Sequence, residues 1–90
     1  MRDLILYRQP KKFLEKLINK DSSLTKKIIL ALEELKINSL PNSSKQLIGY
    51  KELYRIRVEK HRIVYQFDKL SIRILLIETR DKIYSEIRKL

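Results

Sequence analysis

The spacing of the apolar residues changes near Leu53, from intervals of three or four positions to an alternation of every second position. Upstream, apolar side chains recur at helical spacing over residues 11–19 and again over residues 24–35, which predicts two amphipathic helices. Downstream, residues 53–59 and 62–67 alternate between apolar and polar side chains, as half-buried strands do. The chain is therefore predicted to form a helical hairpin followed by a β-hairpin.

The other N-terminal segments complete this half of the molecule. Residues 2–8 alternate weakly around an apolar centre, which suits a short first strand, and Pro10 is tolerated in the first turn of the helix that follows. Asp21 and the two serines after it offer side-chain oxygens that cap the N-terminus of the second helix. Residues 38–46 are polar and contain a proline, which predicts a loop, and Gly49 predicts a turn before the next strand.

The C-terminal third adds one strand and one helix. Residues 72–77 are almost uniformly apolar and predict a central strand that is covered on both faces, and residues 81–90 suit a short helix. The predicted order is β-α-α-β-β-β with a short C-terminal helix. This is an α+β fold in which the helical hairpin packs on a mainly antiparallel twisted sheet. A chain of 90 residues is expected to form one domain, spanning residues 1–90.

Several classes of site are excluded by residues that the chain lacks. It has no cysteine, so disulfides, thiolate nucleophiles, zinc fingers and iron–sulfur centres are excluded, and its single histidine leaves no set of metal ligands. We therefore expect neither a metal nor a cofactor. No apolar run approaches the roughly 18 residues that a membrane span needs, and the N-terminal residues are too charged for a signal peptide. A cytoplasmic protein without a membrane partner is expected.

The charge of the chain points to an anionic partner. Lysine and arginine number 21 against 11 acidic residues, which gives a formal net charge of +10 and a sequence pI of about 10.0. The basic residues are spread along the whole chain rather than collected in a tail. Polyanions or an acidic protein are therefore the expected partners.

The register of the predicted β-hairpin brings arginines together. Pairing Val58 with His61 around a two-residue turn is one register that puts the apolar side chains of both strands on one face. Arg57 then lies opposite Arg62, on the same face as Arg55 and away from the core. Like charges in direct opposition destabilise a strand pair by roughly 0.2 to 1 kcal/mol, so this arrangement suggests a bound anion such as phosphate. The alternative is a solvated face.

Under that alternative, acidic neighbours screen the arginines. Glu52, Glu59 and Glu78 are the carboxylates near enough in sequence to do so. His61 is predicted to point with the apolar face or to lie in the turn, as a structural residue rather than a proton carrier.

Two residues at the C-terminal end strengthen the anion-binding interpretation. Arg80 directly follows the central strand, and Tyr84 stays near it if the tail is helical. A ring beside several guanidiniums can stack on a nucleobase while the arginines hold its phosphates. The alternative for Tyr84 is packing against the sheet.

These segments resemble a known family. The stretches LIGYKELYRIRVEKHRIVYQF and IETRDKIYSEIRKL are similar to the RelE/ParE superfamily of bacterial toxins from type II toxin–antitoxin pairs, and the ending IYSEIRKL is most like its RelE branch. The order of elements along the whole chain agrees with a RelE-like fold. One departure lies in the β-hairpin turn, where Glu59 and Lys60 replace the glycine that is common in the family.

The resemblance implies an activity and roles for five residues. RelE-type toxins cleave mRNA in the ribosomal decoding site, without metal, by attack of the ribose 2′-oxygen on the adjacent phosphate. Carried over to this chain, Arg55 and Arg62 stabilise the phosphate, Arg80 assists the leaving oxygen, and Tyr84 stacks on the base and orients it. Arg57 occupies a position that is commonly lysine, the assigned general base, and arginine is a poor proton acceptor. We therefore expect Arg57 to act electrostatically. The general base would then be Glu52, Glu59, His61 or ribosomal RNA.

Two other functions remain open on the sequence. A ParE-like toxin inhibits DNA gyrase by binding it and needs no catalytic residues, and an inactive family member would only bind nucleic acid. Retention of Arg80 and of the tyrosine in its YSE context favours the nuclease. The resemblance also implies partners: a cognate antitoxin with an acidic segment over the arginine face, the bacterial ribosome with mRNA, and operator DNA bound only as the toxin–antitoxin complex.

Overall fold

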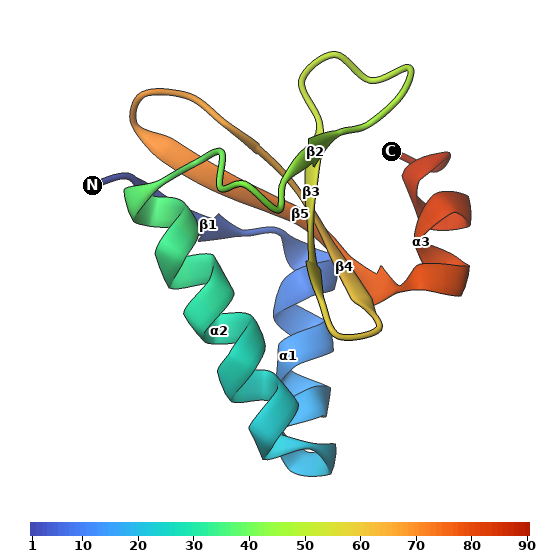
Figure 1. Cartoon of the computed structure of the whole chain (residues 1–90). Coiled ribbons are helices and arrows are strands. Elements are labelled where there is room, and N and C mark those ends of the chain that lie inside the picture. The colour runs from blue at the N-terminus through green and yellow to red at the C-terminus, as the bar shows by residue number, and fades with distance from the viewer.

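The structure, a computed structural model, describes residues 1–90, and Figure 1 shows the arrangement of its elements. In chain order these are β1 (Asp3–Leu6), α1 (Arg8–Lys20), α2 (Ser22–Ile37), β2 (Lys45–Gln46), β3 (Tyr54–Val58), β4 (His61–Phe67), β5 (Ser71–Thr79) and α3 (Arg80–Ile87). The predicted order of strands and helices is confirmed. The exception is β2, a two-residue strand inside the segment 38–46 that was predicted to be a loop.

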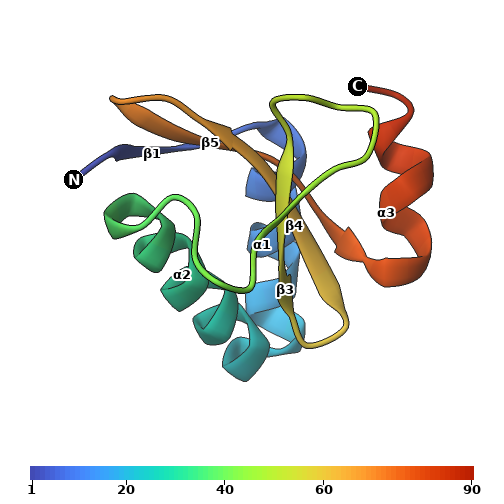
Figure 2. The ribbon, with the colours of Figure 1, turned by 45° about the horizontal axis from the view of Figure 1, so that its top comes forward.

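The five strands form one mixed sheet with helices on both faces. The strand order is β1-β5-β4-β3-β2, with β1 parallel to β5 and all other neighbours antiparallel. The helical hairpin of α1 and α2 covers one face, and α3 lies against the other (Figure 2). None of the three helices combines the length and the apolar character that crossing a bilayer requires. The predicted α+β class and the central, doubly covered position of β5 are confirmed.

The helical hairpin forms for the reasons expected from its sequence. The carboxylate of Asp21 accepts a hydrogen bond from the backbone N–H of Leu24 at 3.0 Å and so caps α2. Leu24, Ile28, Leu32 and Leu35 then face the sheet and are buried. The far end of the hairpin extends past the β3–β4 turn in Figure 1, and Ile18, which belongs to the apolar stripe of α1, is accordingly exposed there.

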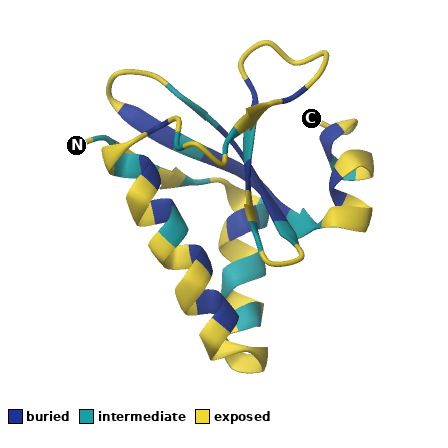
Figure 3. Ribbon diagram, viewed as in Figure 1, coloured by how far each residue is buried: buried dark blue, intermediate teal, exposed yellow.

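Two apolar clusters lie on opposite faces of the sheet, and the strands between them are the most buried part of the chain (Figure 3). The larger cluster, under the helical hairpin, contains Ile56, Ile63 and Tyr65 from the β3–β4 hairpin. The smaller one joins α3 to the sheet through Ile83 and Ile87. The face that carries the arginines is therefore partly covered by α3 rather than wholly solvated.

A β-bulge in β5 supplies the smaller cluster with two adjacent leucines. Val64 pairs with Leu76 while Tyr65 pairs with Ile74, so Leu75 has no partner on β4. Both Leu75 and Leu76 are buried beneath α3. The extra residue changes the face of the sheet on which each later side chain of β5 lies. Glu78 is therefore directly opposite Arg62.

The end of β5 that leads into α3 is fixed by one side chain. β1 pairs with β5 only as far as Leu6 and Ile74, which leaves the edge of β5 beyond that point without a strand. There the side-chain amide of Gln9 donates to the carbonyl oxygen of Ile77 at 2.8 Å and accepts from its N–H at 2.9 Å. The side chain of Gln9 thus makes the two hydrogen bonds to Ile77 that a neighbouring strand would make. It joins α1 to the part of β5 that precedes Arg80.

Candidate functional site

The predicted register of the β3–β4 hairpin is confirmed. Val58 pairs with His61, and Arg57 lies directly opposite Arg62. Arg55 lies two residues before Arg57 on the same face of β3. Arg80 begins α3, and Tyr84 follows one turn later on the same helix, so all five predicted site residues lie on the face that α3 partly covers.

Arg62 is the buried member of this group. Only 9% of its surface is exposed, and its Nε and Nη1 atoms are buried without a hydrogen-bond partner. Burial lowers the pKa of the Arg62 guanidinium, and the charges of Arg55 and Arg57 lower it further. Arg80 acts in the same direction, whereas Tyr84 raises that pKa. A buried cation that lacks partners is costly, and an anion would supply both the charge and the missing acceptors.

The arginine cleft is a hollow of about 480 Å³ at the junction of the β3–β4 turn with the start of α3. Its lining contains no apolar side chain and consists of Arg57, Glu59, Lys60, Arg62, Thr79, Arg80 and Asp81. Four of these residues are cations and two are carboxylates. None of the chain's four ion pairs involves an arginine of the cleft. The cleft therefore keeps a local excess of positive charge.

The acidic residues that were considered as screens for the arginines have other partners or lie elsewhere. Glu59 pairs with Lys27 of α2 at 2.6 Å. Glu78 faces Arg62 across the strands, but its carboxylate accepts from the backbone N–H of Thr79 at 3.0 Å and forms no ion pair. Glu52 is exposed in the segment before β3. None of the three forms an ion pair with an arginine of the cleft, although Glu78 lies opposite Arg62 and Arg57 is exposed to solvent.

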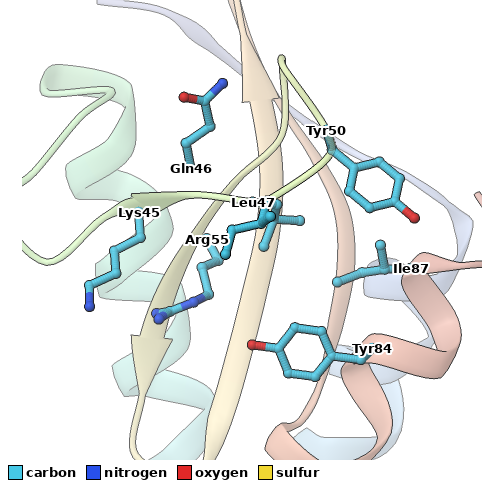
Figure 4. A pocket seen from close by; sticks show the side chains of 8 residues that line it. Lys45, Gln46, Leu47, Tyr50, Arg55, Tyr84 and Ile87 are labelled. Carbon is cyan, nitrogen blue, oxygen red and sulfur yellow. The ribbon is translucent and has the colours of Figure 1, made fainter.

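Arg55 and Tyr84 line a second hollow, the tyrosine pocket, which Figure 4 shows from close by. Its volume is about 320 Å³, and it is lined by Lys45, Gln46, Leu47, Ile48, Tyr50, Arg55, Tyr84 and Ile87. Arg55 and Arg57 share one face of β3, so the pocket and the arginine cleft adjoin along that strand. The five predicted residues are divided between the two hollows: Arg57, Arg62 and Arg80 in the cleft, Arg55 and Tyr84 in the pocket.

The tail tyrosine is not part of the buried contact between α3 and the sheet. Ile83 and Ile87 make that contact and are buried, whereas 50% of the surface of Tyr84 is exposed. Half of its surface is thus covered, beside Arg55 of β3 in the tyrosine pocket, and half is open to solvent. His61, by contrast, packs edge-on against Phe13 of α1, with ring centroids 5.5 Å apart, on the opposite face of the sheet from the arginines. Its predicted orientation, with the apolar face, is confirmed.

Lys45 and Tyr50 line the tyrosine pocket but were not among the predicted site residues. Lys45 lies on β2 and pairs with Arg55, and Tyr50 lies in the connection that follows. A strand of two residues is too short to show periodicity, so the sequence offered only one weak signal, a tyrosine directly after the single glycine.

Comparisons with known proteins agree with this geometry. Residues 4–84 match the family described as the ParE toxin of the type II toxin–antitoxin system parDE. A search of curated proteins gave no match. Twelve solved chains are similar, among them the YoeB dimer from Staphylococcus aureus, with 21% identity, a TM-score of 0.78, and coverage of 88% of this chain and 97% of that chain.

Two further structures are complexes of a toxin with its antitoxin. The RelB–RelE complex from Methanococcus jannaschii has 27% identity and a TM-score of 0.66, and covers 89% of this chain and 94% of that chain. The DinJ–YafQ complex from E. coli has 20% identity and a TM-score of 0.73, and the match covers 92% of this chain and 97% of that chain. These likenesses confirm the RelE-like fold, and the match over nearly the whole length shows that the chain belongs to the ParE toxin family of type II toxin–antitoxin systems, within the RelE/ParE superfamily.

Proposed function

We propose that this toxin is a ribosome-dependent mRNA endonuclease, which cuts mRNA in the decoding site without a metal ion by attack of a ribose 2′-oxygen on the adjacent phosphate. The observation that carries the proposal is the buried, unpartnered guanidinium of Arg62 among three other arginines. A protein surface that only had to be soluble would not retain such a group. A phosphate that gains negative charge in the transition state supplies what the guanidinium lacks.

We propose a role for each of the five predicted residues. Arg62 and Arg55 hold the scissile phosphate, and Arg57 adds positive charge against the developing phosphorane. Arg80, which lines the cleft at the start of α3, stabilises the leaving 5′-oxygen. Tyr84 stacks on a base and fixes the conformation of the nucleotide, which in-line attack requires.

The proton of the 2′-hydroxyl needs an acceptor, and Glu59 is the best placed of the candidates within this chain. It lines the arginine cleft beside Arg57 and Arg62. His61 faces the other side of the sheet, and Glu52 lines neither hollow. One oxygen of the Glu59 carboxylate accepts from Lys27 of α2 at 2.6 Å, so this exposed ion pair has to open before the carboxylate can take a proton in the cleft. We therefore propose that Glu59, rather than Arg57, accepts the proton of the 2′-hydroxyl.

The toxin would be neutralised by a cognate antitoxin. Solved relatives are complexes of this kind, namely YoeB–YefM, YafQ–DinJ and RelE–RelB. The net charge of +10 and the unpaired arginines favour an antitoxin whose acidic segment covers the arginine cleft. Free toxin would act in the cytoplasm on ribosomes and mRNA, and the toxin–antitoxin complex would bind operator DNA.

The decisive experiment maps mRNA ends by primer extension on programmed bacterial ribosomes. Wild type is expected to cut inside the codon of the decoding site, and Arg62→Ala and Arg80→Ala are each expected to lose about 100-fold or more of that cutting. Arg88→Ala is the matched control, because Arg88 is exposed on the last turn after α3 and lines neither hollow. Folded, antitoxin-free wild type that leaves mRNA intact contradicts the proposal.

The second candidate is inhibition of DNA gyrase by protein binding, and the matching family model, that of the ParE toxin, favours it. Inhibition of purified gyrase supercoiling without any ribosomal cleavage would establish that function. Salt-sensitive RNA binding with neither activity would indicate an inactive member of the family.

A further inference from the structure

We propose that the tyrosine pocket is a receptor for one unpaired nucleobase, and that Tyr50 helps to determine which base enters. The inference rests on the proposed function for the nature of the chain that enters, a single-stranded RNA. Stacking of a base on Tyr84 is already part of that function; the addition is the rest of the pocket and Tyr50 as a specificity-determining residue.

Two aromatic rings border the pocket from different elements. Tyr84 comes from α3, and Tyr50 comes from the connection between β2 and β3; Figure 4 shows their rings on either side of Ile87. Tyr50 and Tyr84 are 38% and 50% exposed, and neither hydroxyl makes a hydrogen bond within the chain. Exposed rings with free hydroxyls suit stacking on a base and hydrogen bonding to its edge.

The floor and the mouth of the pocket differ in chemistry. Leu47 and Ile87 are buried and apolar at its base, whereas Lys45 and Arg55, which pair across β2 and β3, are cations at its side. A volume of about 320 Å³ is at the lower end of the range for small-ligand sites, so the pocket suits a single flat group rather than a duplex. An apolar slot with cations beside it matches a base and its phosphate.

The backbone of Tyr50 is held by its own loop in the absence of any ligand. The N–H of Tyr50 donates to the carbonyl oxygen of Leu47 at 3.2 Å, and the carbonyl of Tyr50 accepts from the N–H of Leu53 at 3.2 Å. Leu47 and Leu53 are both buried, and Gly49 provides the left-handed turn with φ of 84°. A backbone that is already held reduces the freedom that the residue loses on binding, which favours discrimination between bases.

The pocket also lies where a phosphate in the arginine cleft would direct its neighbouring base. Arg55 lines the pocket, and Arg57, two residues along the same face of β3, lines the cleft. One strand of RNA can therefore contact both hollows, with its backbone on the arginines and one base between the tyrosines. This continuity is the reason to assign the pocket to RNA rather than to an unrelated small molecule.

The test measures binding of a short RNA to the isolated toxin. The probe is a trinucleotide with 2′-O-methyl riboses, which cannot be cleaved, compared with the same trinucleotide lacking its central base. Wild type is expected to bind the intact probe about tenfold more tightly than the abasic one. Tyr50→Ala should remove most of that difference, and Tyr50→Phe should keep the stacking part of it. Tyr7→Ala is the matched control, since Tyr7 is similarly exposed but lies outside the pocket.

The proposal is overturned by equal binding of the two probes, by no measurable binding of the intact probe at millimolar concentration, or by a Tyr50→Ala variant that keeps the base dependence. A second readout is sequencing of cleavage ends on ribosomes, where Tyr50→Ala should change the distribution of cut codons. Base-dependent binding by a wild type that cuts no mRNA would refute the nuclease function and leave the base receptor standing. Cleavage of mRNA without base-dependent binding would support the nuclease function and refute the base receptor.

Discussion

Arg57 and Arg62 face each other directly across β3 and β4, and neither forms an ion pair with a carboxylate. Only the Nε of Arg57 has a partner, the carbonyl oxygen of Glu59 at 3.0 Å. Like charges in this position cost a strand pair roughly 0.2 to 1 kcal/mol. The chain therefore maintains the arginine cleft at the expense of its own stability, and the following predictions depend on that.

Replacement of Arg62 by methionine should stabilise the protein while it abolishes cleavage. Methionine retains the apolar stem and removes a buried charge that has no partner, so the free energy of unfolding should rise by about 1 kcal/mol. Urea denaturation measures the change, with Arg88→Met as an exposed control that should stay within about 0.5 kcal/mol of wild type. A destabilised Arg62→Met would mean that the guanidinium makes a favourable interaction in the free toxin.

Inorganic phosphate should stabilise the wild-type toxin more than chloride does at equal ionic strength. An anion bound by the arginines stabilises only the folded state, so the melting temperature should rise with phosphate concentration. The increase should be smaller in Arg57→Ala and Arg62→Met. Thermal melts monitored by circular dichroism measure it, and an equal increase in all three proteins would point to binding elsewhere.

Glu59→Gly should stabilise the β3–β4 turn. Glu59 has a φ of 54°, in the left-handed region, where a residue with a side chain costs about 1 kcal/mol more than glycine. The ion pair that the substitution removes is with Lys27, and both side chains are about half exposed or more, so little is lost with it. Glu59→Gln keeps the strain and loses only the charge. Equal stability of the two variants would refute the argument from backbone strain.

Glu59→Gln should also slow cleavage by about 100-fold or more if Glu59 accepts the 2′-hydroxyl proton. Its binding to ribosomes should change little, because the variant keeps the size of the side chain. Single-turnover cleavage on programmed ribosomes separates the two steps. An unchanged cleavage rate would indicate that a group of the ribosome, and not Glu59, accepts the proton.

The stability contributed by Asp68 should disappear in acid. Hydrogen bonds from the N–H groups of Leu70 and Ser71, and from the Arg73 side chain, lower the pKa of the Asp68 carboxyl to about 2. Since the folded pKa lies below the ordinary value near 3.9, this contribution is complete above about pH 4 and is lost as the pH falls to about 2. The melting temperatures of wild type and Asp68→Asn should differ above pH 4 and converge near pH 2. A constant difference would show that the carboxylate charge is not responsible.

Local pattern was sufficient for most of the secondary structure and for part of the site. The spacing of apolar residues predicted the helical hairpin, and burial of Ile56 and Ile63 on one face led to a register in which Arg57 opposes Arg62. The placement of Tyr84 near the arginines followed from helical spacing after Arg80. These features depend on residues that are close in sequence, so the sequence alone determined them.

The tertiary structure decided what depends on contacts between distant segments. β2 exists only because β3 offers it an edge, and that pairing brings Lys45 beside Arg55. The bulge at Leu75 lets two adjacent leucines pack under α3, which no alternating pattern predicts. Burial of Arg62 and the pocket between Tyr50 and Tyr84 likewise require elements far apart in the chain to be packed together. Periodicity records which face of an element is apolar, whereas the depth of a side chain and the walls of a pocket are set by what packs against that face.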